Sequence, residues 1–306
     1  MDPGTSSSGE RYGIPPSLGE YRGGMRVLVF LDGTPADPGA AQIKVDDLGL
    51  MRGDGVFETI LVVDGKPREL RPHLERLARS AAMLDLPEPD LGAWERVVSL
   101  VLERWAGSSE MVLKLVYTRG SDGDPDAGPT GFALGSEVSP SIWRARAEGV
   151  AAITLERGFP PDLAERAPWL LLGAKPLSYA MNMAAVREAG RRGAEDVIFT
   201  AADGSVFEGP TSTVVLAKGR TLYTPPSSIG ILPGTTQAAL FRGAEKAGWV
   251  VKVEPLTVRD LVEGDGVFMV SSVRKLARVH TLDGERLPDS SAVYGELVAA
   301  YEAEYA

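Results

Sequence analysis

The order of short apolar runs constrains the fold of this chain more than any other feature. Runs with the apolar and β-branched side chains typical of strands alternate irregularly with segments of helical spacing. In the helical segment that begins near Pro72, Leu74, Leu77 and Ala81 fall on one face. Because the alternation is irregular, the order predicts an α/β chain built as α+β layers and not a repeat of strand–helix–strand units. The runs predicted to form strands are VLVFL, VFETILVV, MVLKLVYT, VAAITL, DVIFT, SVF, STVVLA, VVKVE and GVFMV.

The chain is expected to consist of three parts. Residues 1–24 are rich in Gly, Ser and Pro and contain few apolar residues, so they are predicted to be a flexible leader. A small N-terminal domain over 25–145 and a larger cofactor-binding domain over 146–306 are expected to follow. The boundary is placed after the loop GSDGDPDAGPTG and the segment SEVSPS, which are dense in turn-forming residues.

Composition excludes several classes of function. The 32 Lys and Arg residues against 42 Asp and Glu residues give a net charge of −10, so neither nucleic acid nor an anionic membrane is expected as a partner. There is no cysteine, and the two histidines are too few for most zinc or iron sites, so no metal is expected. No apolar run approaches the roughly 20 residues of a membrane span, and the start lacks the order of a signal peptide. These features predict a cytoplasmic protein.

Lys175 is a lone cation in the run LLGAKPLSYAMN, since the nearest charged residues in the sequence are Arg166 and Arg187. A lysine that loses its hydration in an apolar setting has a lowered pKa, and its neutral amine can form a Schiff base with an aldehyde. Pyridoxal phosphate requires such a lysine, an anion partner for its pyridine nitrogen and donors for its phosphate. A surface lysine at a strand end would also explain this residue taken alone.

The sequence offers candidates for the other two requirements. Glu208 follows the run SVF and precedes a Gly-Pro turn, where its carboxylate could keep a pyridine nitrogen protonated, although a solvated turn residue would look the same. Thr235 and Thr236 open a helix expected over about 233–247, so hydroxyls and backbone N–H groups meet at the positive end of its dipole. Ordinary capping of a helix would explain this pattern equally well.

Two further groups could contact a phosphate. Ser271 and Ser272 end the strand GVFMV, and paired serines also commonly do no more than end strands. His73 and Arg76 lie three residues apart and therefore on one helix face. The Arg76 guanidinium could hold a phosphate with two N–H groups, whereas an arginine on an amphipathic helix is more often solvated.

Taken in order, these segments resemble one known family. HLERL, AKPLSYAMN, EDVIFTAADGSVFEGPTSTVV, YTPPSSIGILPGTTQ and MVSSV are similar to the motifs of the fold-type IV, or class IV, aminotransferases that use pyridoxal 5′-phosphate. The family includes branched-chain aminotransferases, D-amino acid aminotransferases and 4-amino-4-deoxychorismate lyases. The resemblance extends from GDGVFET to the last strand and implies two α/β domains with the cofactor between them. It also implies a homodimer.

The resemblance implies a role for each candidate residue. Lys175 would be the catalytic Schiff-base lysine, and Glu208 the partner of the pyridine nitrogen. The remaining residues implied to hold the cofactor are Arg76, Thr235, Thr236, Ser271 and Ser272, which would contact its phosphate, and Tyr179, which would contact its phenolic oxygen or form the wall of the site. A purely structural role at a helix end is the alternative for Tyr179.

Departures from the family patterns favour one member over the others. D-Amino acid aminotransferases resemble this chain at TRG, residues 118–120, but carry an arginine and a histidine shortly afterwards, whereas SDGDPDAG follows here. Branched-chain enzymes tend to have a proline and a tyrosine where this chain has Gly120 and Ala180. The resemblance therefore favours a 4-amino-4-deoxychorismate lyase of folate biosynthesis. Against this reading, lyases often carry an asparagine where this chain has Ser178.

The expected substrate is a small anionic molecule, because the favoured lyase acts on a carboxylate. Arg119 is the candidate for binding that carboxylate, and its alternative is a structural residue at a strand end. An aminotransferase acting on D-amino acids or branched-chain amino acids stays the alternative function. A non-catalytic relative of the same fold is a further alternative, although such a relative would be expected to lose Lys175 first.

Overall fold

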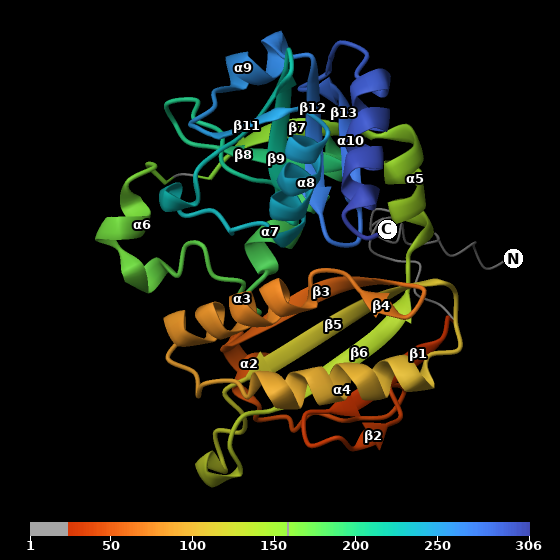
Figure 1. Ribbon diagram of the computed structural model, residues 1–306. Coiled ribbons are helices and arrows are strands. Elements are labelled where there is room, and N and C mark those ends of the chain that lie inside the picture. The colour runs from red at the N-terminus through yellow and green to blue at the C-terminus, as the bar shows by residue number, and fades with distance from the viewer. Residues whose placement is uncertain (1–23, 158) are drawn as a thin grey trace, which may run out of the picture.

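The computed structural model describes residues 24–157 and 159–306. The predicted leader therefore lies, apart from Gly24, outside the described residues. Two sheets with their own helices form separate layers, as Figure 1 shows. The α/β fold expected from the order of the apolar runs is confirmed.

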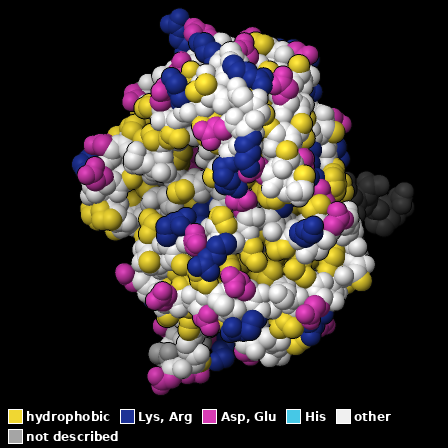
Figure 2. All heavy atoms as spheres, in the orientation of Figure 1, with side chains coloured by type: hydrophobic (Ala, Val, Ile, Leu, Met, Phe, Trp, Pro, Cys, Tyr) yellow, Lys and Arg dark blue, Asp and Glu magenta, His cyan; other side chains and the backbone are white. Residues whose placement is uncertain are grey.

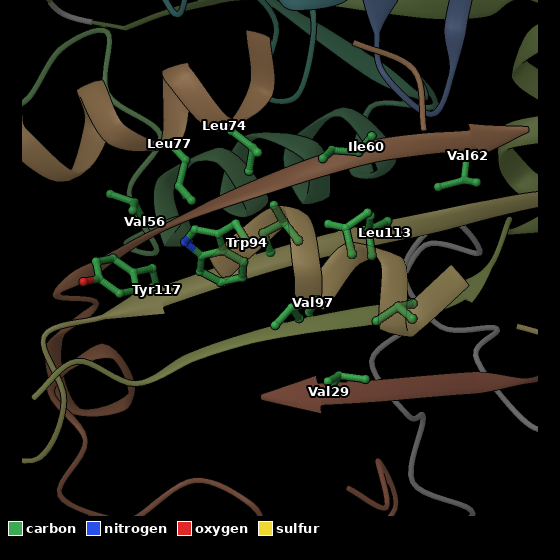
Figure 3. Packing of buried hydrophobic residues seen from close by; sticks show 14 of the residues in the cluster. Val29, Val56, Ile60, Val62, Leu74, Leu77, Trp94, Val97, Leu113 and Tyr117 are labelled. Carbon is green, nitrogen blue, oxygen red and sulfur yellow. The ribbon is translucent and has the colours of Figure 1, made fainter. Parts of the chain in front are cut away.

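The first sheet is antiparallel, and helices cover one of its faces. Figure 3 shows the core between this sheet and α3 and α4, where Leu74, Leu77 and Trp94 pack on Ile60 and Leu113. All five of these side chains are fully buried. In order across the sheet, the strands are β2 (Pro35–Ala36), β1 (Arg26–Phe30), β6 (Gly131–Glu137), β5 (Glu110–Thr118), β3 (Gly55–Val63) and β4 (Lys66–Pro67). The helices of this part are α2 (Leu48–Arg52), α3 (Leu70–Met83) and α4 (Leu91–Arg104).

Asp64 and Gly65 form the turn that links β3 and β4. Both residues have positive φ angles, 48° and 74°, as a two-residue hairpin turn of the favoured twist requires. The register of β3 against β5 is regular over nine residue pairs, from Gly55 opposite Thr118 to Val63 opposite Glu110. Alternate residues of β3 therefore point to the helix-covered face and to the opposite face of the sheet.

The second sheet is mixed and lies between helices. Helices α8 and α10 pack on each other and on one face of this sheet. Their shared core includes Leu240, Phe241, Leu297 and Tyr301. In order, its strands are β11 (Val250–Val253), β10 (Thr221–Thr224), β9 (Thr213–Lys218), β12 (Gly266–Ser271), β13 (Lys275–Leu282), β7 (Val150–Glu156) and β8 (Asp196–Thr200), and β14 (Glu285–Arg286) pairs with β13. Its helices are α5 (Pro140–Glu148), α6 (Leu163–Arg166), α7 (Ala180–Arg191), α8 (Thr235–Lys246), α9 (Val258–Glu263) and α10 (Ser291–Ala303). Single turns of 3₁₀-helix occur at Pro125–Ala127, Pro168–Leu170 and Ser227–Ile229.

Two local predictions from the sequence differ from the structure. The run SVF does not form a strand, because Ser205 and Val206 make only isolated bridges to Thr257 and Thr200. The segment after SEVSPS forms helix α5, which the sequence reading missed. The predicted domain boundary near residue 145 lies inside this helix, which packs on β13. The division into 25–145 and 146–306 stays a prediction.

Charged side chains join the two layers along a seam. Glu110 at the start of β5 pairs with Lys275 of β13 at 3.0 Å and with Arg146 of α5 at 2.8 Å. Lys275 also pairs with Glu302 of α10 at 2.9 Å, and Arg68 bonds the same carboxylate. These side chains are largely shielded from solvent, so the contacts hold the sheets in one arrangement more firmly than exposed pairs would.

Across the described residues, no helix has both the length and the apolar composition needed to cross a membrane. The predicted cytoplasmic location stays a prediction.

Candidate active site

The segment that carries Lys175 is attached to the free edge of β3. Pro176 forms a bridge with Val56, and Phe57 donates its backbone N–H to the Lys175 carbonyl at 3.1 Å. Leu177 donates to the Gly55 carbonyl at 2.8 Å. Proline fits here because the pairing asks for no N–H at its position. A lysine encoded after the first sheet is thus held by that sheet.

The Lys175 amine lies between two aromatic rings. Its Nζ is 4.4 Å from the centroid of Phe57 and 5.5 Å from that of Tyr179. Desolvation by the surrounding protein lowers the pKa of Lys175 to about 8, and the Arg76 charge acts in the same direction. Near neutral pH, a useful fraction of the amine is therefore unprotonated. This is the chemical state that a nucleophile or a general base needs.

Ser80 fixes the backbone of Lys175 from the other side. Its buried hydroxyl, on helix α3, accepts the Lys175 backbone N–H at 3.1 Å. Sequence reasoning missed this residue. Ser80 directly precedes Ala81 of the apolar helix face, and nothing in this position indicates a contact with a distant segment.

A buried carboxylate on β3 organises helix α3. Glu58 accepts hydrogen bonds from Nε and Nη2 of Arg76, each at 2.7 Å, and lies 2.7 Å from Nδ1 of His73. Although burial acts to raise it, the Arg76 charge holds the pKa of Glu58 far below its usual range. Burial lowers the pKa of His73, so this ring is neutral and its Nδ1–H donates to Glu58. Sequence reasoning also missed Glu58, an acid on the buried face of a strand.

His73 and Arg76 lie against the predicted phosphate contacts of the second sheet. Nε2 of His73 is 3.0 Å from the Thr235 hydroxyl and 3.1 Å from that of Ser272. The Thr236 hydroxyl donates to Ser272 at 3.3 Å. The two contacts of His73 join residues more than 150 positions apart in the chain. We call Arg76, Thr235, Thr236 and Ser272 the anion cradle.

The anion cradle has donors to spare for a phosphate. Arg76 uses three of its five N–H groups, two on Glu58 and one on the Pro233 carbonyl at 2.8 Å. Helix α8 begins after Gly234 without any side-chain cap, so its first backbone N–H groups are not bound by a capping side chain. Hydroxyls, a guanidinium and a helix N-terminus together suit a phosphate dianion. Ser271 ends β12 beside the cradle, but its hydroxyl makes no hydrogen bond to it among the residues described.

Glu208 is buried and held in place by two donors. Phe199 of β8 donates its N–H to the Glu208 carbonyl and accepts the N–H of Phe207, which fixes the backbone at this point. The Glu208 carboxylate is 3.1 Å from Arg157 and accepts the Leu232 N–H at 3.1 Å. Burial raises the pKa of Glu208, while Arg157 acts in the opposite direction. Arg157 was not found from the sequence, where it is an arginine directly after a strand with no sign of its partner.

The two other predicted residues lie in different settings. Tyr179 stands beside Lys175, packs edge-on against Phe57 and donates its hydroxyl to the Pro210 carbonyl at 2.6 Å. Arg119 bonds Asp54 through two nitrogens and also donates to the carbonyls of residues 84 and 85. These four hydrogen bonds leave Arg119 with one of its five N–H groups. Its role as a substrate ligand stays a prediction.

Two cavities adjoin this set of residues without containing Lys175. One of about 340 Å³ lies between α3 and the start of α8 and is lined in part by Thr235. The other, of about 490 Å³, is lined by Asp54, Trp169 and Ser178 among others. The chemical groups, and not the size of a cavity, mark the site around Lys175.

Known proteins resemble the chain over most of its length. The family model described as amino-transferase class IV matches residues 55–282. A bifunctional aminodeoxychorismate lyase / D-amino acid transaminase of Mycobacterium tuberculosis is 47% identical over 285 residues, which cover 90% of this chain and 98% of that protein. A hypothetical aminotransferase from Mycobacterium tuberculosis, solved in a PLP-bound form, has a TM-score of 0.88 at 46% identity and covers 92% and 98% of the two chains. A fold IV-transaminase from Curtobacterium pusillum has a TM-score of 0.86 at 41% identity, covering 91% and 99%.

Proposed function

Since the chain belongs to the class IV aminotransferase family and is therefore an enzyme dependent on pyridoxal phosphate, we propose that it is a 4-amino-4-deoxychorismate lyase. It would release pyruvate and 4-aminobenzoate from its substrate. The observation that carries this proposal is the similarity, over almost the full length of both chains, to a relative named for this lyase activity. Because that relative is also named a D-amino acid transaminase, we propose transamination of D-amino acids as the second candidate.

The residues of the site fit the cofactor. In this proposal the Lys175 amine binds its aldehyde group, Glu208 faces its pyridine nitrogen, and the anion cradle holds its phosphate. Ser271 adds to the phosphate contacts, and Tyr179 forms a wall of the site. The bound cofactor supplies an electron-withdrawing ring that stabilises negative charge at the substrate carbon that loses a proton.

Lys175 is the proposed general base. The pKa of about 8 means that its amine can both accept and return a proton near neutral pH. It removes the proton from the substrate carbon that carries the amino group. The C–O bond on the neighbouring carbon then breaks, its electron pair leaves with the oxygen of the enolpyruvyl group, and the ring becomes aromatic. The released enolpyruvate takes up a proton at its methylene carbon and becomes pyruvate. In transamination, Lys175 would instead return the proton to the cofactor, and no C–O bond of the substrate would break.

Glu208 and its donors support this chemistry electrostatically. Arg157 and the Leu232 N–H act to keep the buried Glu208 carboxylate charged and fix its direction. A charged carboxylate beside the pyridine nitrogen favours the protonated ring, which withdraws electrons more strongly.

Product analysis with no keto acid present tests the proposal. The cofactor-loaded protein is given 4-amino-4-deoxychorismate, and 4-aminobenzoate and pyruvate are measured together over many turnovers. Equal and continuing release of both supports the lyase, because a transaminase without an acceptor stops after one half-reaction. If neither product forms, while D-alanine and 2-oxoglutarate yield pyruvate, the second candidate replaces the first.

We also propose that the chain forms a homodimer. Exposed apolar side chains support this proposal: Trp169 is 74% exposed, and Leu50 and Met51 on α2 are 64% and 66% exposed. Figure 2 shows hydrophobic side chains gathered over the region of α6 in the orientation of Figure 1. Arg52, at the C-terminal end of α2, lines the same cavity as Trp169. Exposed apolar side chains that gather on one surface are typical of an interface.

A further inference from the structure

Lys114 is a lysine in the middle of the first sheet. It lies on β5, opposite Thr59 of β3 and Leu134 of β6. Its neighbours in sequence, Leu113 and Leu115, belong to the fully buried core under α3 and α4. Because side chains alternate along a strand, Lys114 points to the face that these helices do not cover.

Lys114 shares this face with the groups around Lys175. Phe57 lies two residues from Thr59 on β3, so the register makes Phe57 and Lys114 diagonal neighbours, about 7–8 Å apart between Cα atoms. The Lys175 amine lies over the Phe57 ring. The Lys114 charge is close enough to contribute to lowering the pKa of Lys175. The two amines therefore stand over adjoining parts of one surface.

Lys114 has no anionic partner of its own. Within residues 24–157 and 159–306, its ammonium forms no hydrogen bond and no ion pair. The side chains beside it on this face are Thr59, Val112, Val116 and Leu134, and none of them carries charge. Glu58 lies on the opposite face and is bound by Arg76 and His73. The Lys114 residue as a whole is exposed, but the surrounding protein desolvates its amine enough to lower the pKa of Lys114.

A free cation beside a reacting centre fits an anionic substrate. A partly desolvated ammonium without an anionic partner is stabilised when an opposite charge meets it. The predicted carboxylate ligand Arg119 has one N–H left, whereas the ammonium of Lys114 has three. In 4-amino-4-deoxychorismate, the ring carboxylate lies across the ring from the carbon that carries the amine. A substrate held at Lys175 can thus direct this carboxylate along the sheet.

We propose that Lys114 binds the ring carboxylate of the substrate and thereby selects cyclic amines that carry a carboxylate at this position. The proposal rests on the lyase function proposed above and names the residue that recognises its substrate. The same contact holds the product 4-aminobenzoate, which keeps this carboxylate.

Binding of two ligands that differ only in the carboxylate tests the proposal. Affinities of the cofactor-loaded protein for 4-aminobenzoate and for aniline are measured by calorimetry in the wild type and in Lys114→Met, which keeps the length of the stem. A hydrogen bond to a charged group contributes about 1.5–3 kcal/mol, so 4-aminobenzoate should bind roughly 10- to 100-fold more weakly to Lys114→Met. Aniline should bind equally to both proteins.

Two further variants separate charge from structure. Lys114→Arg keeps a cation and should retain most of the affinity for 4-aminobenzoate. Lys66→Met removes an exposed lysine from β4, which pairs with the far end of β3, and should leave both affinities unchanged. In turnover, Lys114→Met should raise KM for 4-amino-4-deoxychorismate more than it lowers kcat, because Lys175 is intact.

The outcomes distinguish this proposal from the lyase function. If the wild type releases pyruvate from 4-amino-4-deoxychorismate and Lys114→Met binds 4-aminobenzoate as well as the wild type does, the role of Lys114 is overturned and the lyase function stands. If the wild type releases no pyruvate, the lyase function fails. Binding of a ring carboxylate by Lys114 is then supported only if the wild type binds 4-aminobenzoate more tightly than aniline. Lys114→Met must also bind the two ligands with equal affinity.

Discussion

At the scale of single residues, the setting of Lys175 explains why a cation sits in an apolar run. Desolvation and the nearby Arg76 charge favour its neutral form, while two aromatic rings confine the amine. The sequence made this residue a candidate because a lone lysine in an apolar run can be seen without knowledge of its contacts, and its catalytic role stays a prediction. Glu58, Ser80 and Arg157 were missed because their importance depends on partners in other elements of the fold.

The rate at which the cofactor-free protein takes up pyridoxal phosphate should depend on the protonation of Lys175. Only the neutral amine attacks an aldehyde, so the rate should rise as the pH increases through about 8, well below the usual lysine value of about 10.4. Stopped-flow absorbance between pH 6 and pH 10 measures it. A midpoint near the usual lysine value would contradict the desolvated setting. Lys175→Ala should show no such covalent uptake and no turnover.

The buried Glu58 should be essential for stability. Glu58→Gln leaves the Arg76 charge buried without its partner, so we expect a loss of about 3–5 kcal/mol in the free energy of unfolding. Urea denaturation followed by circular dichroism measures the loss. Glu75→Gln is the control, because Glu75 makes an exposed pair with Arg71 on the same helix, and such a pair contributes at most about 1 kcal/mol.

The same carboxylate predicts a sensitivity to acid. The folded-state pKa of Glu58 is lowered, so its contribution to stability is present above the unfolded value of about 4.3 and is lost as the pH falls towards the folded one. Wild-type stability should therefore fall below about pH 4.3 more steeply than that of Glu58→Gln. Parallel curves for the two proteins would show that Glu58 contributes nothing to the acid dependence.

At the scale of elements, α8 carries out two tasks. Its first turn supplies Thr235 and Thr236 to the anion cradle, and its middle packs tightly on α10. At Gly243 the approach is so close that an added Cβ would lie 2.2 Å from the Ala300 carbonyl oxygen. A side chain there would push the two helices apart and move the start of α8 as well.

Gly243→Ala should destabilise the protein, although alanine is the better helix former. The overpacking at Ala300 should cost about 1–3 kcal/mol in the free energy of unfolding, as measured by chemical denaturation. Gly295→Ala in α10 is the matched control, since an added Cβ there meets nothing within 4 Å. That variant should gain about 0.5–1 kcal/mol. Equal effects of the two substitutions would show that contact with Ala300 is not what distinguishes them.

The elements predicted from the sequence differ in how well they could be seen. Long runs such as β3 and β5 are clear because their residues alternate or are continuously apolar. The run SVF looked like a strand, but its residues find only single bridging partners, one of them in the distant segment at Thr257. Helix α5 escaped notice because it has no fully buried residue and so no apolar periodicity. In both cases tertiary contacts, and not the intrinsic propensity of the residues for strand or helix, determine the secondary structure.

At the scale of the whole molecule, the fold followed from the order of elements, whereas the site did not follow from any one sheet. Lys175 is attached to the first sheet, whereas Ser272 and Glu208 belong to the second part. Helix α3 contacts both parts, since it bonds Lys175 through one residue and Ser272 through another. Such convergence of distant segments cannot be read from periodicity. The ordered family motifs supplied what the pattern of single segments could not.

The proposed homodimer should be visible in solution. Light scattering should give the mass of two chains, about twice 32.5 kDa. Trp169→Asp places a charge at the most exposed tryptophan position, so we expect it to weaken association. Val45→Asp, at a residue that is 83% exposed but does not line the cavity beside Trp169, is the comparison and should leave the mass unchanged. A wild-type mass of one chain would contradict the dimer.

The attachment of Lys175 to β3 also limits how this protein can be recombined with its relatives. A crossover after the first sheet would take β3 from one parent and the lysine segment from the other, so the bonds from Phe57 and to Gly55 would join backbones of different origin. The seam through Glu110, Lys275 and Arg146 would be mixed in the same way. Chimeras designed to exchange substrate preference should therefore keep β3, the Lys175 segment and these charged residues from a single parent.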